Sequence, residues 1–259
     1  MVNQEQNPPQ QEQPFVAAKQ IGFNLEDIIL NPNNEVTLLY PEHNNKDNLK
    51  CVFDFIYKCC LRKPFTKSPN MYKEYLIGFQ YSAKALENSK VYFSTPIGGI
   101  YGEIGVNTFR NAIGAHYLPL SSEYVAPPSI DIVRPWFETI RYREVVPAKG
   151  TLKKSLFPPR WRLLIAQIIQ CLRGKTISFD QITNKEAIIL YSLANRINID
   201  YASIFWEDII IKLNKKHREK VVPYTRFLSL LMMHKMKEGY EDGELTTLPN
   251  LRFIVSTKH

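Results

Sequence analysis

The side chains that could act as general acids or bases do not stand in a catalytic spacing. His116 precedes a Tyr-Leu-Pro run outside any nucleophile arrangement, and His234 falls on an apolar helical face. The five histidines form no H-E-x-x-H pair. Catalysis would require a concave pocket that unites His116, Glu103 or Asp208 with shifted pKa values. We therefore predict structural histidines and no enzymatic activity.

An adjacent acidic pair, Glu207-Asp208, also fails to make a catalytic site. Neighbouring positions on a helix diverge by about 100°, so the two carboxylates cannot face one substrate. Asp208 falls near an apolar stripe, and we predict that it forms a buried ion pair with a base such as Arg196. The aspartic protease motif Asp-Thr/Ser-Gly and the polymerase motif Tyr-x-Asp-Asp do not occur in the sequence.

Neither a metal site nor a phosphate-binding loop is visible, so we predict no metal and no cofactor. Cys51, Cys59 and Cys60 lack a C-x-x-C spacing and a histidine pair. On a helix Cys60 falls in the apolar stripe, which favours a packing role. The glycines between Gly98 and Gly105 match neither the G-x-G-x-x-G nor the P-loop spacing, and a glycine-rich hairpin accounts for them.

Composition and chain features indicate an ordinary globular protein. Hydrophobic residues make up 44% and charged residues 22% of the 259 positions. Four cysteines do not form a disulfide framework, the opening residues contain no apolar signal segment, and no apolar run reaches about 18 residues. We expect an intracellular protein of the cytoplasm or nucleus, neither secreted nor associated with a membrane.

Positive charge concentrates in the second half of the chain. Residues 141–240 hold 19 Lys or Arg and 8 Asp or Glu, while the whole chain carries a net charge of +8. Clustered cations attract polyanions by releasing their counterions. The residues that we predict to contact phosphate, without reading bases, are Lys153, Lys154, Arg160, Arg162, Lys215, Lys216, Arg218 and Lys220.

These basic features have second interpretations. The tract from Lys215 to Lys220 also suits a solvated helix end. In Arg160-Trp161-Arg162 the tryptophan would stack on bases if exposed and anchor the core if buried; its place at the start of an apolar stripe favours the core. An amphipathic helix over 201–213 could instead support self-association or bind a protein partner.

Helical periodicity dominates the first half, with one β-like interval. Apolar residues recur at helical spacing over 47–60, 71–86 and 107–115. A glycine-rich turn between short β-branched and aromatic runs predicts a small hairpin near 91–104. Pro135 fits the first turn of a further helix.

Four helices are predicted in the second half. Trp161 begins an apolar stripe that Gly174 ends. The capping box Thr183–Glu186 opens a helix that is apolar nearly all round and should be central. Asp200 can cap the next helix, and Pro223 stands at the start of the last.

The sequence therefore predicts a mainly α fold in four parts. Residues 1–20 form a disordered Gln/Pro-rich tail, and residues 21–146 form an α-rich region with the small hairpin. Residues 147–240 form a compact basic helical bundle, and 241–259 form a frayed tail. The proline-broken segment 147–159 is the best internal boundary.

Several long motifs resemble a family of plant proteins associated with copia-type retrotransposons. The similarity extends roughly from 34 to 238, and the helical half is also similar to a plant transposon protein domain. The motifs that carry it are Val91–Gly105, Asn107–Leu118, Pro158–Leu164, Asp180–Lys185 and Trp206–Lys216.

The resemblance implies a Gag-like structural or nucleic-acid-associated module that is not an enzyme and binds RNA or DNA. Family members carry inherited labels such as retrovirus-related polyprotein and synaptobrevin, longin-like protein. A longin domain needs a five-stranded antiparallel sheet, which these helical stripes do not supply. The alternatives are a protein-interaction or self-association module and, because members often continue into a Ser, Lys and Pro-rich tail, a truncated copy with no retained function.

Overall fold

The fold is mainly α with small antiparallel strands, which confirms the predicted class. The expected tails lie outside the described residues, apart from Glu241, which ends a 3₁₀ helix. The computed structural model describes residues 46–66, 70, 72–94, 102–116, 123–146, 149–173, 180–215, 222 and 224–241.

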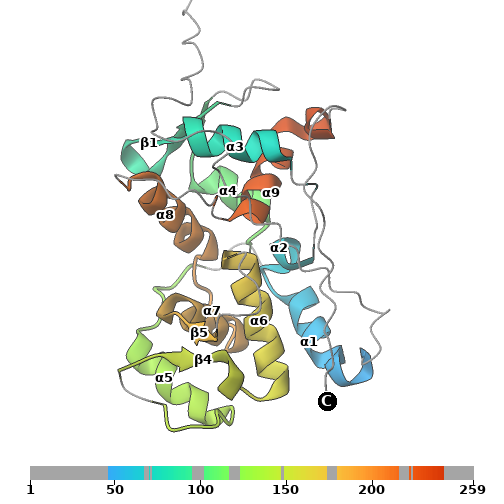
Figure 1. Ribbon diagram of the computed structural model, residues 1–259, viewed down its shortest axis with the longest axis vertical. Helices are drawn as coiled ribbons and strands as arrows, with labels where there is room; N and C mark the ends of the chain where they lie inside the picture. The colour runs from blue at the N-terminus through green and yellow to red at the C-terminus, as the bar shows by residue number, and fades with distance from the viewer. Residues whose placement is uncertain are drawn as a thin grey trace, which may run out of the picture.

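Helices and short strands alternate along the chain (Figure 1). The α-helices of the described residues are α1 (Lys46–Lys58), α2 (Arg62–Thr66), α3 (Lys73–Ser82), α4 (Val106–Ile113), α5 (Ile130–Thr139), α6 (Pro159–Arg173), α7 (Asn184–Ala194), α8 (Tyr201–Leu213) and α9 (Thr225–Met236). The 3₁₀ helices are η4 (Glu87–Ser89), η5 (Lys154–Leu156) and η6 (Lys237–Glu241). The strands are β1 (Lys84–Ala85), β2 (Val91–Phe93), β3 (Gly102–Ile104), β4 (Leu152–Lys153) and β5 (Gln181–Ile182).

The predicted hairpin is present, and a third strand extends it. β2 pairs antiparallel with β3, with Val91 opposite Ile104, and β1 pairs with the other edge of β2. The return strand of the hairpin, β3, begins at Gly102. Within the described residues the larger sheet has three strands rather than the five of a longin domain.

The helix predicted over 71–86 is shorter than expected. α3 ends at Ser82, and the next residues pair with β2 as β1. The Ser82 hydroxyl donates to the Ser94 carbonyl at 2.5 Å and accepts from the Ser94 N–H at 2.9 Å. A serine side chain that binds backbone groups competes with helix propagation. Leu86, which the periodicity places last in the helical stripe, is 39% exposed.

Pro135 also differs from its predicted place. α5 begins at Ile130, so Pro135 stands in the second turn rather than the first. Proline there removes one backbone N–H donor. The loss falls on the exposed side of the helix, where the unpaired carbonyl of Asp131 can be solvated.

The predicted caps of α7 and α8 are confirmed. Thr183 and Glu186 form the reciprocal capping box of α7. Most of that helix is buried, as expected for a central element. Asp200 caps α8 by accepting the Ser203 N–H at 3.1 Å.

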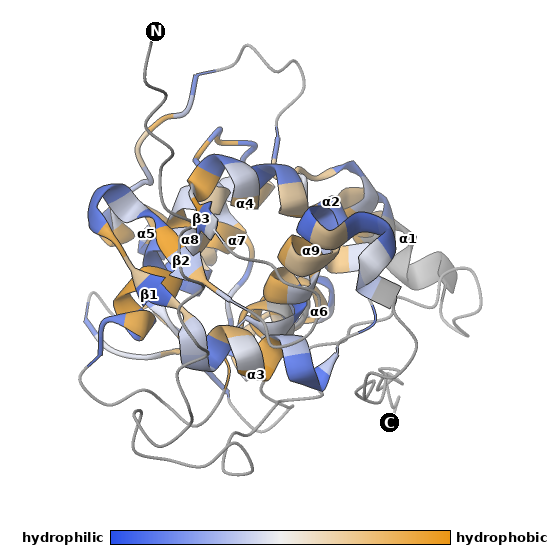
Figure 2. Ribbon diagram, turned by 90° about the horizontal axis from the view of Figure 1, so that it is seen from above, coloured by the Kyte–Doolittle hydropathy of each residue, from blue (hydrophilic) through white to orange (hydrophobic). Residues whose placement is uncertain are grey.

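One hydrophobic core includes residues from both sides of the 147–159 segment. α9 packs against α2, α3 and α4, and α8 packs against α4 and β1. Phe109 of α4 contacts Trp206 of α8 and Phe227 of α9, with ring centroids 5.1 and 6.5 Å apart. Figure 2 shows α9 as a largely hydrophobic ribbon surrounded by other helices. The four helices of the second half therefore pack on the first half as well as on one another.

The helices that the structure describes include none with the length and apolar character needed to cross a bilayer.

Candidate nucleic-acid interface at the start of α6

Aromatic rings build the floor of the region around the start of α6. Trp136 of α5 meets Trp161 of α6 edge to face, with ring centroids 5.3 Å apart. Phe157, which is fully buried, makes similar edge contacts with Phe137 at 5.2 Å and with Tyr142 at 5.1 Å. These rings hold the end of α5, the following turn and the start of α6 in one rigid unit.

Backbone hydrogen bonds fix the loops of this region against each other. The Arg143 N–H donates to the Leu156 carbonyl at 3.1 Å. The Lys153 N–H donates to the Tyr142 hydroxyl at 2.8 Å. Burial raises the pKa of Tyr142, and the bond from Lys153 opposes that rise only in part. Tyr142 therefore stays a neutral acceptor that positions the β4 backbone.

An open hollow of about 470 Å³ lies where these loops meet. Its apolar surface comes from two prolines, an isoleucine and a tryptophan, and two arginines add charge. We call it the α6 hollow; its lining residues are Thr139, Ile140, Arg141, Pro158, Pro159, Arg160 and Trp161.

The arginines at the α6 hollow are available to a ligand. Arg141 and Arg160 are exposed, and neither guanidinium makes a hydrogen bond or ion pair with any residue that the structure describes. The first turn of α6 contains no acidic residue, so nothing within that turn offsets the positive end of the helix dipole. Arg162, one residue beyond Trp161, is also exposed.

Lys153 and Lys154 lie beside a carboxylate. The Lys154 N–H donates to the Asp180 carbonyl at 2.7 Å. Burial opposes the charge on Asp180, but two hydrogen bonds from Ser155 and the nearby lysines outweigh it and lower the pKa of Asp180. Asp180 is therefore ionised at neutral pH and offsets part of the lysines' charge.

The structure brings only some of the predicted phosphate-binding residues together. Strand β4, η5 and the first turn of α6 gather at the lower end of the molecule in Figure 1, whereas the end of α8 reaches the opposite end beside β1. Lys215 follows α8 and is exposed. Lys216, Arg218 and Lys220 lie outside the described residues. We call the basic residues around β4, η5, the start of α6 and the segment after α5 the basic end. They are Arg141, Arg143, Lys153, Lys154, Arg160 and Arg162.

Sequence reasoning missed Arg141. No local motif marks it, since it follows α5 in an irregular segment. Its backbone adopts a left-handed conformation, with φ of 64°. The turn returns the chain to η5, as the bond between Arg143 and Leu156 shows, and thereby places Arg141 beside Arg160 at the hollow.

Asp208 forms the predicted kind of contact with different partners. Its carboxylate pairs with Lys185 and with Lys212, each at 2.7 Å, and accepts the Tyr224 hydroxyl at 2.6 Å. Burial opposes the charged form, but these three hydrogen bonds outweigh it and lower the pKa of Asp208 to about 2. Arg196, the partner that we expected, is exposed after the end of α7 in a left-handed turn, and Lys185 takes its place.

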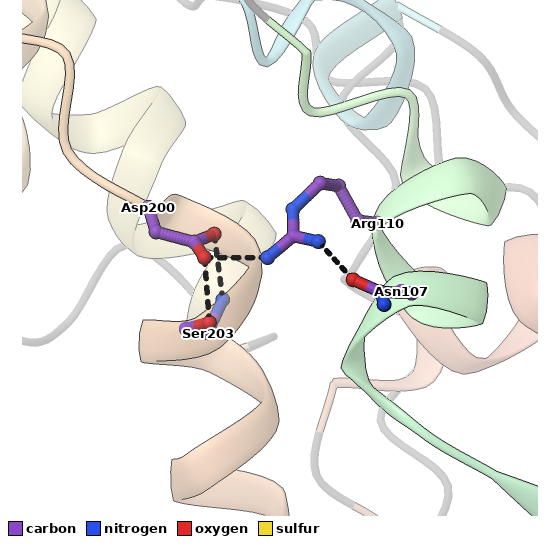
Figure 3. Close-up of polar contacts among 4 residues, drawn as sticks. All are labelled: Asn107, Arg110, Asp200 and Ser203. Atoms are coloured by element: carbon purple, nitrogen blue, oxygen red, sulfur yellow. Dashed lines mark hydrogen bonds and ion pairs between the residues drawn. The ribbon is translucent and has the colours of Figure 1, made fainter. Parts of the chain in front are cut away.

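A second arginine site joins α4 to α8 (Figure 3). Arg110 donates to Asp200 at 2.5 Å and to Asn107 at 2.5 Å. Asp200 also accepts the hydroxyl of Ser203 at 2.7 Å. Burial opposes the charge of Asp200, but the bonds from Ser203 and Arg110 outweigh it and lower the pKa of Asp200. We call these four residues the Arg110 joint.

The candidate acid–base residues occupy separate surroundings. Glu103 pairs with Lys90 at 2.8 Å on the exposed face of the sheet, while Asp208 is engaged by lysines of α7 and α8. His234 is exposed rather than on the apolar face, because the buried residues of α9 end at Met232. Partial desolvation and then nearby lysines lower the pKa of His234.

The described cysteines behave as packing residues or surface thiols. Cys59 and Cys60 are partly buried against the core, and Cys51 is exposed. The described ranges contain no group of three His, Cys, Asp or Glu side chains able to hold a metal ion.

Comparison of the chain with family models, with curated proteins and with solved structures gives no match. The site must therefore be interpreted from its own geometry.

Proposed function

We propose that this chain is a non-enzymatic, retroelement-derived module that binds nucleic acid through sequence-independent phosphate contacts at the basic end. The observation that carries the proposal is the pair Arg141 and Arg160, which are exposed and unpaired among the described residues, on a rigid aromatic floor. Guanidinium groups are well suited to phosphate because their planar donors match its oxygens.

The local charge balance also supports a polyanion. Four of the six cations of the basic end are exposed arginines, and the carboxylates of Glu144 and Asp180 act on the same segment at Tyr142. The four exposed arginines correspond to contacts with about four phosphates, and Lys153 and Lys154 are left out of this count because Asp180 offsets part of their charge. The uncompensated start of α6 adds to the same field.

The test is a titration of the purified chain into labelled single-stranded RNA and duplex DNA at several salt concentrations, followed by fluorescence anisotropy. Four phosphate contacts to a single strand predict a log–log salt slope of about −3. The double variant Arg160→Glu/Arg162→Glu should weaken binding at least tenfold and reduce the slope by about 1.4. Its thermal midpoint should stay unchanged because both side chains are exposed.

The matched control is Lys73→Glu/Lys84→Glu, which changes net charge by the same amount at exposed positions on α3 and β1. It should alter affinity less than threefold. Equal losses in the two double variants would mean that binding follows net charge and would contradict the assignment to the basic end. No binding to either nucleic acid at low salt would overturn the proposed function.

A further inference from the structure

The α6 hollow has features that phosphate contact alone does not require. Phosphate is recognised by charged and polar donors, yet Ile140, Pro158 and Pro159 give most of the hollow an apolar surface. Its volume of about 470 Å³ lies in the range typical of small-ligand pockets. An apolar hollow beside two cations that pair with none of the described residues fits a ligand with a flat apolar part and an attached anion.

We propose that the α6 hollow receives one unpaired base of a single-stranded nucleic acid, which stacks on Trp161 while Arg141 and Arg160 hold its flanking phosphates. This inference rests on the proposed function and names its ligand class. In a duplex both faces of each base are covered by neighbours, so only a single strand can present a face to the indole. Base–aromatic stacking tolerates any sequence because every base has a π-face.

Trp161 is held ready for such contact. It is partly buried against the core and touches Trp136 edge to face, and Trp136 meets Tyr191 of α7 in the same manner at 5.3 Å. The indole therefore has a fixed orientation before the ligand arrives, which reduces the entropy lost on binding. The sequence left two roles open for Trp161, core anchoring and base stacking. Its position is compatible with both, because it packs on the core and also lines the hollow.

The first experiment changes the ligand rather than the protein. The probes are a labelled ten-nucleotide oligothymidine, the same chain with abasic sites at every position, and a duplex of matched length. The oligothymidine should bind about tenfold more tightly than its abasic form, because one stacked base contributes on that scale. Equal affinity for the two would overturn the inference, and no folding defect of a variant can mimic that result.

The second experiment uses Trp161→Leu, which keeps an apolar side chain but removes the indole. Affinity for oligothymidine should fall about tenfold, while affinity for the abasic chain and for the duplex should stay within twofold. The control Tyr92→Leu removes an exposed aromatic ring from β2 and should change none of the three. A loss of equal size for all three probes in Trp161→Leu would contradict stacking.

The two proposals fail in distinguishable ways. If the wild-type chain binds none of the probes at low salt, the proposed function is wrong and the stacking inference falls with it. If the oligothymidine, its abasic form and the duplex all bind equally with a steep salt slope, phosphate contact stands and the base site does not.

Discussion

Arg110 and Arg160 stand on helices of the same protein, yet their surroundings differ. The guanidinium of Arg110 is largely buried, donates to Asp200 and Asn107, and lies 5.3 Å from the ring centroid of Tyr124. That of Arg160 is exposed beside Trp161 with no partner among the described residues. In the Arg110 joint the carboxylate of Asp200 supplies the anion, whereas no carboxylate of the described residues pairs with Arg141 or Arg160 at the α6 hollow, and we propose a nucleic-acid phosphate in that place.

The difference teaches that a cation's role depends on the carboxylates within reach and not on the density of basic residues around it. The Arg110 joint should contribute to stability and leave binding unaffected. The exposed arginines of the α6 hollow should contribute to binding and leave stability unaffected.

The largest expected effect comes from breaking the Arg110 joint with Asp200→Ala. The change leaves Arg110 without its carboxylate, and it also removes the cap of α8. We expect the free energy of unfolding to fall by about 3 kcal/mol, as for other part-buried pairs that lose one partner. Urea unfolding measures it. Affinity for oligothymidine at a temperature where the variant is folded should be unchanged.

Asp200→Asn serves as the control because it removes the charge and one acceptor oxygen but keeps the other oxygen as an acceptor for the Ser203 N–H. Its loss should be smaller than that of Asp200→Ala. A stability loss below about 0.5 kcal/mol in Asp200→Ala would contradict the structural role of the Arg110 joint. A parallel loss of nucleic-acid affinity would show that the two arginine sites are not separate in function.

Acid should weaken the fold through Asp208, which ties α7, α8 and the residue before α9. Its folded-state pKa of about 2 lies below the ordinary 3.8, so its contribution is complete above about pH 5 and is lost as the pH falls from 4 to 2. After allowance for solvent screening it amounts to about 1 to 2 kcal/mol.

Urea unfolding from pH 6 to pH 2 measures the free energy of unfolding of the wild-type chain and of Asp208→Asn, and the difference between them gives the contribution of the Asp208 carboxylate. The wild-type chain should be more stable at pH 6, and the two curves should converge near pH 2. A constant difference across that range would exclude the carboxylate charge as the cause.

Local signals in the sequence predicted the elements more successfully than their partners. The capping box at Thr183 and the cap at Asp200 were readable because each depends on residues three positions apart. The sequence did not predict that Asp200 also pairs with Arg110, because 90 positions separate the two residues. Arg141 lies in the candidate site because its backbone makes a left-handed turn, which no side-chain pattern in the sequence predicts.

The smallest effect is expected at the far end of the molecule. Lys215→Glu changes an exposed residue that follows α8, and the end of α8 reaches β1, at the opposite end of the molecule from β4 in Figure 1. Anisotropy should show less than a twofold loss of affinity, against at least fivefold for Arg160→Glu alone. Equal losses would mean that the ligand extends over both ends, as the sequence alone predicted.

The packing of α9 on α4 has a consequence for the order in which the chain folds. Phe109 finds Trp206 and Phe227 only after about a hundred further residues have been added, and the Tyr240 hydroxyl donates to the carbonyl of Asn70. During synthesis α4 therefore exposes apolar surface until α8 and α9 have left the ribosome. Such distant pairings slow folding relative to a helical bundle of local contacts and make the nascent first half a natural client for chaperones.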